Sequence, residues 1–164
     1  MTAPSSKDAS MNLGLAPRTW ESFVLGERIE SEHITVTESH VVSWASLTGD
    51  WVPLHMDAEY AAATPFGQRI AHGPLTFALS LGLITRTGVF GDAVVAWLGV
   101  DGLRLPAPVL FGDTIRVTVE VAETRPTSKP DRGLTVLAYS VHNQRDETVM
   151  TFTSSFLLRV GATA

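Results

Sequence analysis

The sequence contains no cysteine among its 164 residues. Disulfide bonds, thiolate zinc sites and a cysteine nucleophile are therefore excluded, and this composition fits a reducing compartment. Basic residues are also few, since 12 Lys and Arg stand against 17 Asp and Glu, for a net charge of -5. Without a run of Lys or Arg, the chain has no electrostatic reason to bind a nucleic-acid backbone, and we expect no nucleic-acid partner.

Long apolar runs are absent as well. No stretch of about 18 residues is free of polar interruption, and the first 20 residues lack the apolar core of a signal peptide. We therefore expect no membrane partner and a cytoplasmic location. The composition, 45% hydrophobic and 18% charged, is typical of a folded globular chain. We expect a flexible N-terminal arm at residues 1–17, one domain at 18–160 and a C-terminal tail at 161–164.

Two helices are predicted in the first half of the chain. The hydroxyl of Thr37 can cap a helix that Gly49 ends, immediately before Asp50. Asp57 can cap a short helix that runs through Ala63. The residues from 28 to 37 precede both helices and end in a short alternating run, which predicts a strand.

A third helix is predicted to begin at Pro74 and to end at Gly88. Its apolar side chains point around nearly the whole circumference, so we expect it to be buried on every side. After residue 91 the pattern changes to alternating strands. An α+β fold in which a curved antiparallel sheet wraps this long helix satisfies both patterns. An exposed sheet edge favours a homodimer. The predicted strands cover residues 94–105, 113–124, 134–143 and 148–160.

The stretch "TGDWVPLHMD" places a carboxyl and an imidazole five positions apart, at Asp50 and His55. Such a pair can hold one water molecule and move protons between it and a substrate, which is general acid-base chemistry. The alternative is that Asp50 caps backbone N–H groups and His55 packs against a helix. The spacing alone leaves these two interpretations open.

Two further candidates surround the start of the third helix. Gly73 offers a free N–H and the positive end of the helix dipole, which would stabilise a developing oxyanion. His72 is expected to be a hydrogen-bonding residue rather than a second base. Asp50, His55, Asp57 and His72 are close in sequence, but the spacings of zinc sites are missing, so no metal is predicted.

The segments "TGDWVPLHMDAEYAAATPFGQRIAHGPLT" and "LRLPAPVLFGDTIRVTVEV", taken together, resemble the MaoC-like family of R-specific enoyl-CoA hydratases, over roughly residues 20 to 160. The resemblance implies a hot-dog fold and the hydration of a trans-2-enoyl thioester, or the reverse dehydration, without a cofactor. It implies that Asp50 and His55 are the catalytic pair and that Gly73 donates to the thioester carbonyl. We place the following residues around the substrate: Trp51, Val52, Phe66 and His72.

One residue departs from the family pattern. Members usually carry Asn two positions after the catalytic Asp, where this chain has Val52. Valine cannot orient water by hydrogen bonding, so either the pocket is reshaped for another acyl group or hydratase activity is weakened or lost. Two alternatives therefore stay open: a thioesterase of the same fold, and a non-catalytic acyl-thioester binder or partner subunit. The carrier is expected to be CoA or acyl carrier protein, and the lack of a basic patch favours CoA.

Overall fold

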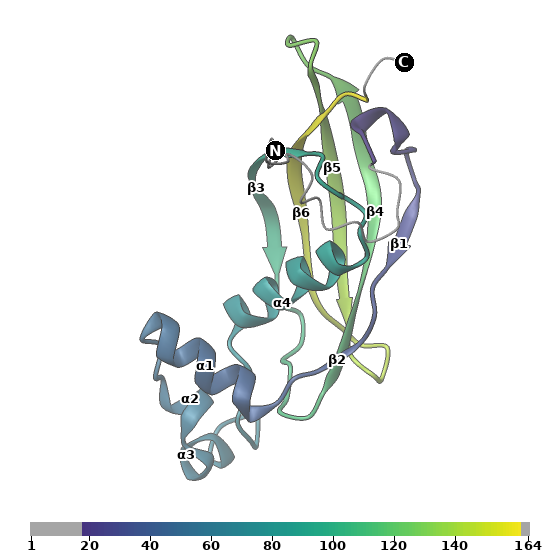
Figure 1. Ribbon diagram of the computed structural model, residues 1–164. Coiled ribbons are helices and arrows are strands. Elements are labelled where there is room, and N and C mark those ends of the chain that lie inside the picture. Colours follow the sequence, from purple (N-terminus) through teal and green to yellow (C-terminus); the bar gives the residue numbers. More distant parts are fainter. Residues whose placement is uncertain (1–17, 162–164) are drawn as a thin grey trace, which may run out of the picture.

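The computed structural model describes residues 18–161, so the predicted arm and residues 162–164 of the predicted tail lie outside it. A long antiparallel sheet has the strand order β1-β4-β5-β6-β3, and a short strand, β2, also pairs with β4. Helix α4 lies across one face of this sheet, and three shorter helices, α1 to α3, form a helical lobe beyond one end of it (Figure 1). The helices are η1 (Trp20–Ser22), α1 (Glu38–Thr48), α2 (Pro53–Met56), α3 (Ala58–Ala62) and α4 (Gly73–Arg86). The strands are β1 (Arg28–Glu30), β2 (Ile34–Thr35), β3 (Val94–Arg104), β4 (Thr114–Pro126), β5 (Arg132–His142) and β6 (Thr148–Arg159).

The three central strands alternate between buried and partly exposed residues, as their sequences predict. Phe152 of β6 links two layers, because its ring stacks on Tyr139 at 4.4 Å and meets Phe77 of α4 edge-on at 5.0 Å. Each fully buried valine or leucine contributes about 1.5–3 kcal/mol of transfer free energy. The alternating faces therefore form the core against α4. Buried members include Val117, Val119, Val121, Leu137 and Val141.

Helix α4 begins at Gly73 with Pro74 in its first turn, as predicted. It ends at Arg86, and Gly88 follows with a φ of +75°, a left-handed conformation that stops the helix. The prediction that this helix is buried on every side is wrong for the single chain, because the sheet covers one side of it only. Its inner residues include Leu75, Leu83 and Ile84, whereas its outer residues include Pro74, Ala78 and Gly82. No helix within residues 18–161 has both the length and the apolar run needed to cross a bilayer.

The helical lobe confirms two predicted helices and adds one. Helix α1 runs between Thr37 and Gly49, and Gly49 is left-handed at a φ of +79°. The side chain of Asp57 accepts a hydrogen bond from the backbone of Tyr60 at 3.0 Å and so caps α3. The additional helix, α2, is short and starts at Pro53, whose ring fixes a helical φ. The predicted strand at residues 28–37 is divided into β1 and β2.

Candidate active site

Asp50 follows directly after α1. The left-handed Gly49 ends the helix and donates its N–H to the Ala45 carbonyl at 2.8 Å. This turn leaves Asp50 outside the helix, with its side chain 38% exposed. Within residues 18–161 no group donates a hydrogen bond to its carboxylate at normal distance, so the oxygens can accept from a ligand.

His55 lies in α2 and is half-buried. Its Nδ1 lies 2.8 Å from the carbonyl oxygen of Ile70, and since a carbonyl can only accept, Nδ1 carries the hydrogen. The other ring nitrogen, Nε2, is then the atom that can accept or deliver a proton. Burial lowers the pKa of His55 below its ordinary value of 6.5. The hydrogen bond to the Ile70 carbonyl opposes this effect, the nearby His72 lowers the pKa further by a smaller amount, and Asp50 raises it least. An imidazole in this environment is a proton acceptor at neutral pH.

Asp50, His55 and His72 converge although they come from three segments. One side-chain N or O atom of each lies within 4.8 Å of those of the other two. The rings of His55 and His72 are 3.8 Å apart between centroids. The sequence-predicted pair is thus brought together, with His72 beside it. No backbone N–H within residues 18–161 donates to the Asp50 carboxylate, so Asp50 does not act as a helix cap there, and its acid-base role stays a prediction.

The same three side chains have the composition of a metal site. However, His55 Nδ1 and His72 Nε2 each face a backbone carbonyl at 2.8 and 2.9 Å, so these two atoms carry hydrogens and cannot act as ligands. Only the opposite nitrogen of each ring would be available to a cation. The expectation that no metal is used stays a prediction.

A cavity of about 250 Å³ adjoins this cluster and the start of α4. Gly73 lines it, and as the first residue of α4 its N–H has no partner within the helix. A Cβ at this position would lie 3.2 Å from a methyl group of Leu105, so glycine also permits the close approach of the opposite wall. The lining residues are otherwise mostly apolar: His55, Phe66, Ile70, Ala71, Thr76, Leu105, Pro106, Ala107, Pro108 and Val109.

Of the other residues predicted to contact substrate, some line this cavity and others lie outside it. Phe66 lines the cavity. Trp51 and Val52 do not line it in the single chain, and these two residues are 53% and 49% exposed. His72 is fully buried, which fits the hydrogen-bonding role predicted for it.

The sequence did not predict that residues 105–109 form one wall of the cavity, or that Asp113 holds this wall in place. The segment "PAPVLFGD" is typical of a turn, and its two prolines gave no sign of a cavity wall. The buried carboxylate of Asp113 accepts from the Leu110 N–H at 2.9 Å, Gln144 Nε2 at 2.7 Å and Arg145 Nη1 at 2.8 Å. This network ties the wall to the turn between β5 and β6.

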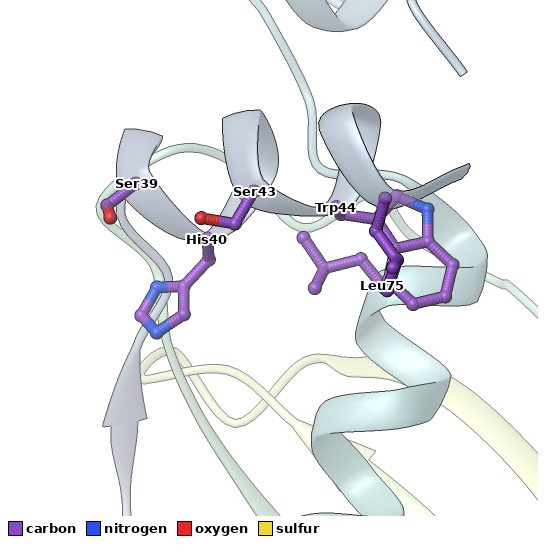
Figure 2. A pocket seen from close by; sticks show the side chains of 6 residues that line it. Ser39, His40, Ser43, Trp44 and Leu75 are labelled. Atoms are coloured by element: carbon purple, nitrogen blue, oxygen red, sulfur yellow. The ribbon is translucent and has the colours of Figure 1, made fainter. Parts of the chain in front are cut away.

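A second cavity of about 260 Å³ lies between α1 and α4 (Figure 2). Ser39, His40 and Ser43 lie at one end of it, and Trp44 and Leu75 lie at the other. His40 is already engaged, because its Nδ1 accepts the N–H of Thr37 at 3.0 Å. None of the predicted site residues lines this cavity.

The antiparallel sheet packed against one long helix defines a hot-dog fold, and in this protein a carboxylate and two imidazoles gather beside the start of that helix. The model of the MaoC like domain matches residues 22–141, and the chain belongs to this family. The resemblance noted from the sequence is confirmed.

The chain is also similar to individual proteins with known names or structures. A 3-hydroxybutyryl-CoA dehydratase from Methylorubrum extorquens is 42% identical over 59% of this chain, and the match spans 60% of that enzyme. A 3-hydroxyacyl-thioester dehydratase Z from Mycobacterium tuberculosis is 39% identical over 62% of this chain and 72% of its own length. A solved structure from Archaeoglobus fulgidus, described as a monoamine oxidase regulatory protein, superposes with a TM-score of 0.83 at 36% identity. It covers 88% of this chain and 96% of its own. The two dehydratases are by name hydro-lyases.

Proposed function

We propose that this protein hydrates a trans-2-enoyl thioester to an (R)-3-hydroxyacyl thioester, or runs the reverse dehydration, with Asp50 and His55 as the acid-base pair. The observation that carries this proposal is the convergence of the Asp50 carboxylate with the His55 imidazole at the start of α4. Two relatives named dehydratases of hydroxyacyl thioesters support the reaction class.

The proposed reaction needs no covalent intermediate. Water loses a proton to the pair as its oxygen bonds to the β-carbon, and the electrons of the double bond move toward the thioester oxygen. The N–H of Gly73, at the positive end of α4, stabilises the resulting enolate. A proton from the pair then reaches the α-carbon, so that the elements of water are added in total. Dehydration follows the same steps in reverse.

We infer that the acyl group is carried by CoA or by acyl carrier protein. The net charge of -5 favours CoA, because an acidic carrier protein would dock better on a positive surface. A comparison of kcat/KM for the same acyl group on each carrier tests this choice. The cytoplasmic location also stays a prediction, which cell fractionation would test.

A panel of enoyl-CoA and 3-hydroxyacyl-CoA thioesters tests the proposed reaction. Loss or gain of the conjugated double bond, followed by absorbance, reports hydration or dehydration. Release of free thiol in the same samples would instead identify a thioesterase. Tight binding without either change would support a non-catalytic binder.

Val52→Asn is expected to raise kcat for hydration of a short, unbranched enoyl thioester. Val52 immediately precedes α2, and its carbonyl accepts the His55 N–H at 2.9 Å, so an amide here would lie near the proposed pair. Asparagine is favourable at such an N-cap position, so α2 should be retained. Steady-state kinetics check the result, with Val52→Thr as a control of similar shape. An unchanged or lower kcat in Val52→Asn would contradict this prediction.

We also infer that two copies associate through β3. This strand is the last in the sheet order, so one of its edges has no strand partner within residues 18–161. Apolar side chains cluster on it, and unpaired edges of this kind favour strand pairing between chains. The exposed members are Val94, Val95, Trp97 and Leu98.

Leu98→Lys is expected to convert a dimer into a monomer. Leu98 is 53% exposed in the single chain, and lysine on an edge strand opposes pairing with a second copy. Sedimentation equilibrium measures the mass. Val24→Lys, an equally polar change at an exposed residue outside β3, should leave the mass unchanged. A wild-type monomer, or a dimer that survives Leu98→Lys, would show that the association does not use this edge.

A further inference from the structure

His72 is the residue immediately before α4, and its side chain is fully buried. Its Nε2 lies 2.9 Å from the backbone oxygen of Asp50, which is 22 positions earlier in the chain. Because a carbonyl oxygen only accepts, Nε2 must carry the hydrogen. The contact therefore joins the end of α1 to the start of α4 through one buried donor.

The hydrogen bond reaches the main chain of Asp50 and leaves its carboxylate free. The nearest carboxylate oxygen, Oδ2, is 3.9 Å from His72 Nε2, beyond hydrogen-bond distance. His72 thus restrains the backbone that carries the acid without engaging the oxygens that would meet a ligand. A residue that acted only as an ionic partner would bind the carboxylate itself.

The ring of His72 also limits where His55 can lie. The two rings are 3.8 Å apart between centroids and inclined by 35°. His55 is held from its other side by the bond from Nδ1 to the Ile70 carbonyl at 2.8 Å. Since Ile70 and His72 lie in the same short segment, that segment fixes both partners of the proposed pair.

The second ring nitrogen of His72 shows that packing alone does not explain this residue. Nδ1 is buried and has no hydrogen-bond partner within residues 18–161. An unpaired buried polar atom destabilises a fold, and an apolar side chain of similar size would avoid this cost. The imidazole therefore offers one useful group here, the donor at Nε2.

We propose that His72 is a positioning residue that sets the separation of Asp50 and His55 before substrate binds. This inference rests on the proposed function of that pair. A displacement of about 1 Å in a reacting group can cost a hundred-fold in rate, so a fixed donor between the two segments has a large effect on kcat. His72 is fully buried and does not line the cavity, so we assign it this positioning role in place of the substrate contact predicted from the sequence.

Two amides of different length test the proposal. In His72→Gln the amide nitrogen can reach the position of Nε2 and donate to Asp50, whereas in His72→Asn it reaches only the position of Nδ1. Both variants bury a polar amide. We expect His72→Gln to stay near the wild-type kcat, and His72→Asn to lose about a hundred-fold in kcat at similar KM. Equal kcat values in the two variants, or a loss confined to KM, would overturn the proposal.

A second measurement does not depend on activity or on the variants folding. The ¹⁵N chemical shifts of the His72 ring in the wild-type protein should show a hydrogen on Nε2 and none on Nδ1. The opposite pattern would remove the donor and overturn the proposal. If the wild-type protein turns over no thioester while its ring shows the expected pattern, the proposed function fails and the structural role of His72 stands.

Discussion

Asp50→Asn and His55→Asn are each expected to lower kcat for hydration by about a hundred- to ten-thousand-fold, the usual contribution of a positioned acid or base. Asp50→Asn removes the charge but keeps the backbone oxygen that accepts from His72. In His55→Asn the amide nitrogen can replace Nδ1 as donor to the Ile70 carbonyl, while the proton-accepting Nε2 is lost. Both changes thus remove the titratable group and retain these hydrogen bonds. Steady-state absorbance of the conjugated double bond measures the effect.

Glu59→Gln provides the matched control. It also replaces a carboxylate by an amide, on an exposed residue of the neighbouring α3, and should leave kcat unchanged. Thermal unfolding should be similar for all three variants and the wild type. Turnover that survives both Asp50→Asn and His55→Asn would refute the assignment of the pair, even if the protein is a hydratase.

Asp113→Ala is expected to give the largest loss of stability, about 2–3 kcal/mol in the free energy of unfolding, because buried donors are left unpaired. The side chain of Asp113 is 4% exposed and accepts from Leu110, Gln144 and Arg145. Arg145 is 43% exposed and can turn to solvent, which keeps the loss below that of a fully buried pair. Urea unfolding of wild type and variant measures the difference. Asp146→Asn breaks only an exposed ion pair with Arg116 and serves as control, with a much smaller expected loss.

The contribution of Asp113 also depends on pH. Burial alone would raise the pKa of this carboxyl, but hydrogen bonds from Arg145, the Leu110 N–H and Gln144 outweigh burial and lower it below 3.8. A lowered pKa means that the folded state binds fewer protons than the unfolded one. The stabilisation is therefore complete above about pH 4, near the unfolded pKa, and is lost as the pH falls through the folded pKa. The difference in the free energy of unfolding between wild type and Asp113→Ala should therefore shrink as the pH falls through this range. A constant difference would argue against the charged network.

The sheet and the long helix could be predicted because their signals are local. Period-two alternation marks β4 to β6, and Pro74 marks the start of α4. The exposure of one side of α4 could not be predicted, because it depends on which face the sheet covers. Helix α2 was missed since four residues are too few to show a periodicity.

In the candidate site, too, only the features that depend on residues close in sequence could be predicted. Asp50 and His55 are close in sequence, so their spacing was visible. The bonds from His72 to Asp50 and from Arg145 to Asp113 join residues 22 and 32 positions apart, and no local pattern reports such contacts. Trp51 and Val52 were placed at the substrate from their position between the pair, yet they lie on the surface of the single chain.

The core and the proposed catalytic pair lie in different parts of the fold, so the two can diverge separately in evolution. Most of the buried core belongs to α4 and the long strands, whereas Asp50 and His55 lie in the lobe beyond the end of the sheet (Figure 1). Substitutions in the lobe can therefore alter the reaction or its substrate while the core keeps the chain folded. Val52, exposed between the acid and the imidazole, is a position where such a substitution removes no buried contact of the core.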